Sequence, residues 1–272
     1  MGPGAGPVKP SSWYYFVDRA DRIGAAKDED RKMGCYLKRT VKAGRIIEVQ
    51  KYYAARFGGH SRTRSPNREK TPADVERINE KNAIEKLRWL INANFGFGDY
   101  HLILTFRKEA RPKGKDEMRE NVEVFLRHAR KLYRGAGKEL RYIQATECKS
   151  KAPHHHLVIK GFDLLELQKL WPHGRIRCFP LDDSGDYTVL AQYIIKETKK
   201  TFRENLSPWG KRWCASRNLV QPEIRYEVVH AESWRKLPRA LKGYILVPDS
   251  VEVGVHEVTG QPWQRYWMRK IE

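Results

Sequence analysis

The chain has 272 residues, and its 53 Lys and Arg against 33 Asp and Glu give a formal net charge of +20. This length can bury a substantial core in one or two domains, and the charge excess indicates a polyanionic partner. No apolar run approaches the roughly 18 residues of a spanning helix, and neither a signal peptide nor a myristoylation pattern opens the chain, so we expect no membrane partner. The four cysteines form no C-x-x-C pair, which excludes zinc-knuckle and disulfide-framework patterns and favours the cytoplasm.

Residues 13–98 are predicted to form a basic N-terminal appendage after a Gly- and Pro-rich, disordered segment at 1–12. Apolar and β-branched runs at 36–41 and 45–50 are separated by a short connection that contains a glycine. This pattern predicts a β-hairpin, and its cations would suit contact with DNA as well as with solvent.

A loop and a linking helix are expected to follow the hairpin. The loop is basic and rich in turn formers, so we expect it to contact phosphates through Arg56, Arg62 and Arg64. Thr71 followed by a proline predicts the start of a long helix, because Ser or Thr caps helices and Pro is favoured in the first turn. Gly96 ends that helix.

The predicted core spans 99–203 and alternates short strands with helices. We expect strands at 100–106, 139–147, 154–159 and 175–179, and helices at about 116–133, 164–170 and 187–199. Adjacent strands joined by a tight connection favour an α+β fold with a mainly antiparallel central sheet and flanking helices.

The strand at 154–159 begins with three histidines. Alternate side chains of a strand share a face, so His154 and His156 are expected on one face and His155 on the other. If the preceding strand pairs with it in antiparallel fashion, Glu147 completes a set of two histidines and one carboxylate. Such a set suits Mn²⁺ or Mg²⁺ and leaves positions open for substrate. A His-x-His also arises by chance in a chain with nine histidines.

The helix at 187–199 carries Tyr193 and Lys196, which are three residues apart and therefore neighbours on its surface. A tyrosine beside an ammonium group can act as an oxygen nucleophile, because the cation and a nearby metal offset charge on an attacked phosphate. Tyr187 is the alternative nucleophile, although six residues place it on a different face. A core tyrosine with a hydrogen-bonded hydroxyl is the competing interpretation.

Residues 204–272 are predicted to form a basic, aromatic C-terminal extension, with strand-like runs at 223–229 and 244–247. Alternating cations and rings are typical of single-strand binders, although many rings of this chain belong to its core. Here and at the end of the core helix, the candidate nucleic-acid-binding residues are Lys200, Arg203, Lys211, Arg212 and Trp213.

The ordered motifs between residues 99 and 203 resemble those of the HUH endonucleases, and among them the Rep-like initiators of rolling-circle replication in plasmids and phages. The strand at 100–106, ending in Thr and Phe, is similar to the first motif of that family. The residues that match its metal and catalytic motifs are Glu147, His154, His156, Tyr193 and Lys196. His155 departs from the family pattern, which has a bulky apolar residue there.

The resemblance implies a ferredoxin-like HUH sheet with the metal on its central strands and the tyrosine helix laid across it. It also implies that Tyr193 nicks and rejoins single-stranded DNA at a replication origin through a covalent 5′-phosphotyrosine. A divalent metal at Glu147, His154 and His156 would polarise the phosphate, and the 3′-hydroxyl would prime synthesis with a host helicase and polymerase.

The sequence is also compatible with three alternatives. An HUH-type transposase shares the chemistry of an initiator. A conjugative relaxase also has clustered histidines, but its tyrosine precedes them, which disfavours this class. A non-catalytic basic RNA- or DNA-binding module would explain the charge and the rings without a metal requirement.

Overall fold

The computed structural model describes residues 35–53, 71–148, 152–256 and 260–271. These residues form two compact units. One unit contains the described residues up to Asn82, apart from 43–46, together with those from Glu223 onward; the other contains 43–46 and 83–222. The segment at 1–12 and the basic loop with Arg56, Arg62 and Arg64 lie outside the described residues.

The first unit is built on an antiparallel sheet. Its strands are β1 (Cys35–Ala43), β2 (Ile46–Tyr52), β8 (Glu223–His230), β9 (Tyr244–Leu246), β10 (Glu252–Val255) and β11 (Pro262–Lys270). Strand order is β10-β11-β2-β1-β8, with β9 also paired to β11. The predicted hairpin and the strands at 223–229 and 244–247 are present. The predicted N-terminal appendage and C-terminal extension are distant in sequence, whereas β1 pairs with β8 from Cys35 opposite His230 to Lys42 opposite Glu223.

A buried ion group links three strands of this sheet. The Glu48 carboxylate lies 3.3 Å from Nη2 of Arg39 and 2.8 Å from Nε of Arg265, and all three residues are buried. A buried charge is tolerated when it is paired and hydrogen-bonded, so this group allows a strongly basic chain to place charges in its interior.

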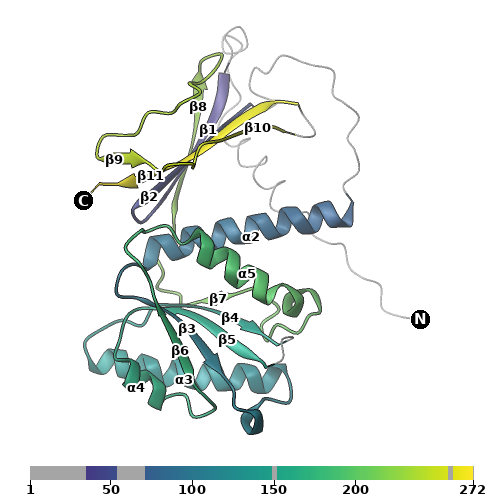
Figure 1. Ribbon diagram of the computed structural model, residues 1–272, viewed down its shortest axis with the longest axis vertical. Helices are drawn as coiled ribbons and strands as arrows, with labels where there is room; N and C mark the ends of the chain where they lie inside the picture. The colour runs from purple at the N-terminus through teal and green to yellow at the C-terminus, as the bar shows by residue number, and fades with distance from the viewer. Residues whose placement is uncertain (1–34, 54–70, 149–151, 257–259, 272) are drawn as a thin grey trace. The chain divides into compact units, whose positions relative to one another are not determined.

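The second unit contains the predicted core and a five-stranded antiparallel sheet of order β6-β3-β5-β4-β7 among its described residues. The strands are β3 (Tyr100–Thr105), β4 (Tyr142–Glu147), β5 (His154–Ile159), β6 (Ile176–Pro180) and β7 (Cys214–Ala215). The helices are α2 (Pro72–Asn94), which begins in the first unit, α3 (Lys115–Gly135), α4 (Leu164–Lys169) and α5 (Thr188–Arg203), with a 3-10 turn at Lys108–Ala110. Figure 1 shows α3 and α4 on one face of the sheet and α5 with the end of α2 on the other. The predicted α+β class with a mainly antiparallel sheet and flanking helices is confirmed.

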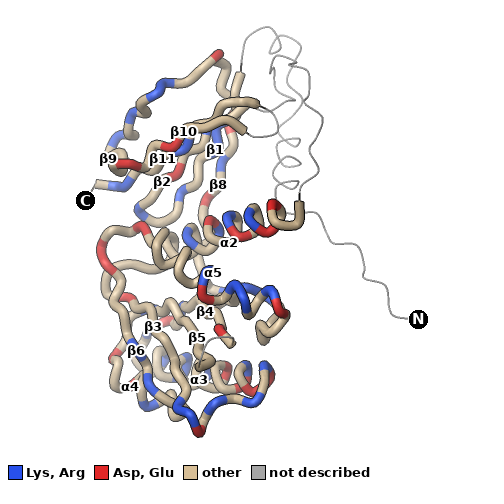
Figure 2. Tube along the Cα trace, turned by 45° about the vertical axis from the view of Figure 1, so that its right-hand side comes forward, with Lys and Arg blue, Asp and Glu red and all other residues tan. Residues whose placement is uncertain are grey.

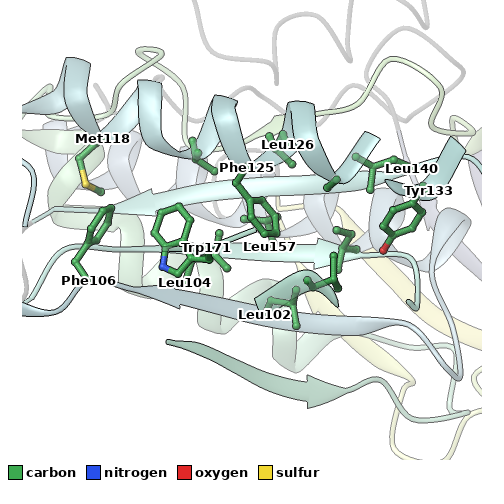
Figure 3. Close-up of a cluster of buried hydrophobic side chains, with 14 residues drawn as sticks. Leu102, Leu104, Phe106, Met118, Phe125, Leu126, Tyr133, Leu140, Leu157 and Trp171 are labelled. Carbon is green, nitrogen blue, oxygen red and sulfur yellow. The ribbon is translucent and has the colours of Figure 1, made fainter. Parts of the chain in front are cut away.

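The face towards α3 is held by a large apolar cluster (Figure 3). Met118, Val122, Phe125 and Ala129 recur at helical spacing on α3 and are buried against alternate residues of the strands. Trp171 is 1% exposed, and its indole Nε1 donates to the Thr105 carbonyl at 2.8 Å. The ring therefore fills the core and satisfies its polar atom at the same time.

The opposite face packs against α5 and the end of α2. Residues Ile143, Ala145 and Val158 of the sheet meet a second apolar cluster that includes Leu87, Ile91, Ala191, Ile194 and Ile195. Burial of this helix stripe fixes the rotation of α5 about its axis. Tyr193, beside Ile194, is thereby held at the edge of the packed surface.

The Asp99 carboxylate connects the start of β3 to the residues that follow β5. It accepts hydrogen bonds from the backbone N–H groups of Gly96 and Gly161 and from the Lys160 ammonium, each at 2.9 Å. Gly161 is required here because a Cβ atom would lie 2.0 Å from the Gly98 carbonyl oxygen. Among the helices of the described residues, none combines the length and apolar character needed to cross a membrane.

Replacing Trp171 with Ala should lower the free energy of unfolding by about 3–5 kcal/mol, because it leaves a cavity and an unsatisfied carbonyl in the core. Leu165, on α4 and 74% exposed, is the matched control, and Leu165→Ala should change stability by no more than about 0.5 kcal/mol. Urea unfolding followed by circular dichroism measures both. Equal losses in the two variants would contradict the assigned core.

Candidate active site

Strand β5 presents its histidines to both faces of the sheet. His154 and His156 lie on the α5 face, whereas His155 points into the α3 cluster. The register places Glu147 of β4 opposite His154. The period of two in a strand therefore separates one histidine from the other two.

The imidazoles of His154 and His156 converge at one point. Their Nε2 atoms are 3.1 Å apart, and the rings are inclined at 72°. Two nitrogen ligands at right angles around one divalent ion, each about 2.1 Å from it, lie about 3 Å apart. The spacing of this pair therefore fits two ligands of a single ion.

The other nitrogen of each ring has its own partner. Nδ1 of His154 lies 3.0 Å from the Ala152 carbonyl oxygen, and Nδ1 of His156 lies 3.2 Å from Nε2 of His101. A hydrogen on Nδ1 leaves the lone pair of a neutral ring on Nε2. Burial, and then the neighbouring His154, lower the pKa of His156 to about 2, so this ring is neutral near pH 7. Neutral imidazole is the form that binds metals.

His101 of β3 is a site residue that the sequence analysis missed. Its ring stacks between those of His156 and Phe179, with centroid distances of 5.4 and 5.7 Å. Burial, and then His154, lower the pKa of His101 to about 4. His101 is polar although it lies in the otherwise apolar run at 100–106, and this contrast could have indicated a functional role. Its contact with His156 could not be predicted in the same way, because it depends on the register of β3 and β5.

The Glu147 side chain lies beside the histidine pair without joining their Nε2 atoms. It is 3% exposed, and Oε2 is 3.8 Å from Nδ1 of His154, the nitrogen on the other side of that ring. Within the described ranges, no group of three or more His, Cys, Asp or Glu side chains is arranged to hold a metal ion. The two imidazoles fit an ion; the predicted carboxylate ligand lies next to them.

Tyr193 of α5 lies against the histidines. Its ring centroid is 5.5 Å from that of His156, almost perpendicular to it, and 5.9 Å from that of His101. The side chain is 38% exposed, so it is open to a substrate while its ring is held in place. Burial, and then Glu197, raise the pKa of the hydroxyl above its ordinary value. The phenol is therefore protonated near pH 7.

Lys196 and further cations follow Tyr193 on the same helix. The first eight residues of α5 carry no charge, whereas the second eight include Lys196, Lys199, Lys200 and Arg203 (Figure 2). Lys196, Lys200 and Arg203 are exposed. The chain thus joins the tyrosine to a positively charged half-helix, which favours a polyanion alongside it.

Tyr187 is placed differently from Tyr193. It is 4% exposed at the start of α5, and its hydroxyl donates to the Asp182 carbonyl at 2.8 Å. Burial, and then Asp182, raise its pKa to about 12. Its backbone N–H donates to Asn92, so this residue anchors the start of the helix.

The third histidine belongs to the core. His155 is fully buried, and its Nδ1 lies 2.8 Å from the Thr146 hydroxyl. Its ring packs near Phe106 and Trp171 at 5.8 and 5.9 Å. Burial lowers the pKa of His155 to about 3, so it is a neutral packing residue.

The remaining nucleic-acid candidates are on or after α5. Lys211 is exposed, and the Arg212 guanidinium lies over the Phe202 ring at 4.7 Å. Trp213 is half-buried and packs against the apolar cluster beneath α5. These three residues therefore differ in how much of each side chain a ligand could reach.

One protein-family model matches most of the second unit. Residues 99–201 match the family model of replication-associated protein ORF2/G2P. In this segment the chain is similar to Rep-like, replication-associated proteins. The matched range begins at the start of β3 and ends within α5, so it contains the histidine strand and Tyr193. No curated protein and no solved structure matches the chain.

Proposed function

We propose that this Rep-like protein nicks and rejoins single-stranded DNA with Tyr193 as nucleophile, and that it does so in the manner of HUH endonucleases. The observation that carries the proposal is the position of the Tyr193 ring, 5.5 Å from His156 of the converging histidine pair. The family match supports a role in replication initiation, and the exposed cations of α5 support an anionic substrate.

In the proposed reaction the Tyr193 oxygen attacks the phosphorus of a phosphodiester. An oxygen–phosphorus bond forms to the tyrosine, which loses its proton, and the bond from phosphorus to the 3′ oxygen breaks. The leaving oxygen takes up a proton and becomes a 3′-hydroxyl, while the 5′-phosphate stays on the protein. Attack by a DNA 3′-hydroxyl reverses the step and joins strands. Lys196 orients the phosphate and offsets its charge.

His154 and His156 would hold a divalent cation, Mn²⁺ or Mg²⁺. Glu147, whose carboxylate faces Nδ1 of His154, would have to turn towards their Nε2 atoms to serve as the third ligand. When bound, such an ion polarises the phosphate and favours the deprotonated tyrosine. His101 positions the ring of His156 through its contact with Nδ1. The proposed biological outcome is a 3′-hydroxyl that primes rolling-circle synthesis by a host polymerase and helicase at a single-stranded origin.

Tyr193→Phe should abolish the covalent protein–DNA adduct, because the ring remains and the attacking oxygen is lost. Tyr187→Phe is the matched control and should retain adduct formation. A library of labelled single-stranded oligonucleotides, incubated with Mn²⁺ and run on a denaturing gel, measures both. A Tyr193→Phe adduct would contradict the proposed nucleophile, and a wild-type protein that binds DNA without any adduct would favour a non-catalytic module.

His156→Ala should abolish tight Mn²⁺ binding, and His101→Phe should weaken it about 10- to 100-fold because the support of Nδ1 is lost. Glu147→Gln tests the carboxylate ligand and should weaken binding as well. His128 on α3 is exposed, so His128→Ala is the control and should bind Mn²⁺ as the wild type does. Calorimetric titration of each protein gives the affinities. Unchanged binding in His156→Ala would contradict the metal proposal.

Lys196→Ala should slow adduct formation about 100-fold at saturating DNA, because a cation that stabilises the transition state is removed. Lys196→Arg should recover part of the rate. Lys200→Ala, one turn further along α5, should weaken DNA binding with little change in the saturated rate. If Lys196→Ala changes affinity alone, Lys196 has a binding role rather than the proposed catalytic one.

A further inference from the structure

The second unit has two adjoining cavities at the end of its sheet where β4 begins. Their volumes are about 610 and 370 Å³, and Lys138 and Glu139 line both. The larger cavity extends between the end of α3 and the residues after β7, and the smaller one extends to Phe97 and Lys160. Together they form one groove, which we call the α3 groove.

Cationic side chains from three separate stretches of chain line the α3 groove. Arg130 and Arg134 lie one turn apart on α3, Lys138 follows the helix, and Arg217 comes from beyond β7. Like charges four residues apart on a helix repel each other. The C-terminal dipole of α3 can stabilise the helix cations, but it does not account for Arg217. An anionic ligand would explain why all four line one cavity.

The acidic residues near the groove do not balance these cations. Glu139 lies 3.8 Å from Arg141, and Asp99 accepts hydrogen bonds from Lys160 and two backbone N–H groups. Arg130, Arg134 and Arg217 are exposed. The lining is therefore positive and open to solvent.

Phe97 supplies an aromatic platform at the end of the smaller cavity. Its side chain is 84% exposed, in a turn between two glycines of which Gly98 has φ +85°. The hydrogen bonds that the Asp99 carboxylate accepts from Gly96 and Gly161 fix the backbone of this turn, so the Phe97 ring projects from an ordered loop. An exposed ring beside cations is the combination that binds single strands, since bases stack on the ring and cations track phosphates.

The α3 groove is distinct from the histidine pair. Tyr142 of the groove begins β4 and Glu147 ends it, and five residues at about 3.3 Å each separate them by about 17 Å. Strand alternation also places the two side chains on opposite faces, and Tyr142 packs with the α3 cluster. A ligand in the groove therefore lies away from the proposed cut.

We propose that the α3 groove is a second binding site for single-stranded DNA, with phosphates held by Arg130, Arg134 and Arg217 and a base stacked on Phe97. Paired bases are already stacked and enclosed by their backbones, so duplex DNA could not offer a base to this ring. The site goes beyond the proposed function, because binding here requires neither the metal nor Tyr193.

The test is fluorescence anisotropy of the full chain with a labelled 20-nucleotide thymidine strand, in EDTA and over a range of salt concentrations. The double variant Arg134→Ala/Arg217→Ala should bind at least about 10-fold more weakly, and the slope of log K against log salt should fall by about 1.4. Phe97→Ala should weaken binding about 5- to 100-fold with an unchanged slope, because a stacked base carries no charge.

Arg127→Ala/Lys131→Ala is the matched control. It removes the same charge from exposed positions of α3 outside the groove lining, and it should change affinity less than about threefold. The proposal is overturned if this control loses as much affinity as the groove double variant, if Phe97→Ala binds as the wild type does, or if the groove variants lose affinity for duplex DNA alone. Loss of single-strand binding in the groove variants supports it even if the wild type forms no covalent adduct, so its outcome is separate from that of the nicking proposal.

Discussion

The candidate site depends on the alternation of side chains along β5. Antiparallel pairing with β3 and β4 fixes the register of this strand, and that register places His154 and His156 beneath α5 while His155 enters the α3 core. A slip of one residue would exchange these faces and place Leu157 beneath Tyr193. The apolar residues on both faces of the sheet therefore stabilise the fold and also hold the histidine pair in place.

Burial shapes the chemistry of His156 and of its neighbour His101. Desolvation lowers the pKa of His101 to about 4 and that of His156 to about 2, so both rings remain neutral in a chain with a net charge of +20. Neutral rings offer lone pairs, whereas the cations of the unit lie at its surface on α5 and around the α3 groove. The same unit thus separates a neutral, buried centre from charged surfaces suited to a polyanion.

Local patterns predicted much of this arrangement, because hydrophobic periodicity and turn residues are encoded within a few positions. The strand at 154–159, the helix that carries Tyr193 and the mainly antiparallel sheet follow from such patterns. His101 could not be found in this way, since it meets His156 through the pairing of β3 with β5. The union of the two chain ends through β1 and β8 is non-local as well. The spacing of the two strands in the sequence predicted that Glu147 lies near His154. The orientation of the Glu147 carboxylate towards Nδ1 of His154 could not be predicted, because it depends on the side chains packed around it.

The proposed function requires that one phenol beside the histidine pair become covalently attached to DNA. Mass spectrometry of the protease-digested adduct, formed with Mn²⁺ and trimmed by a nuclease, identifies the attached residue. We expect a nucleotide joined through its 5′-phosphate to the α5 peptide at Tyr193. Attachment at another residue, such as Tyr187, would contradict it.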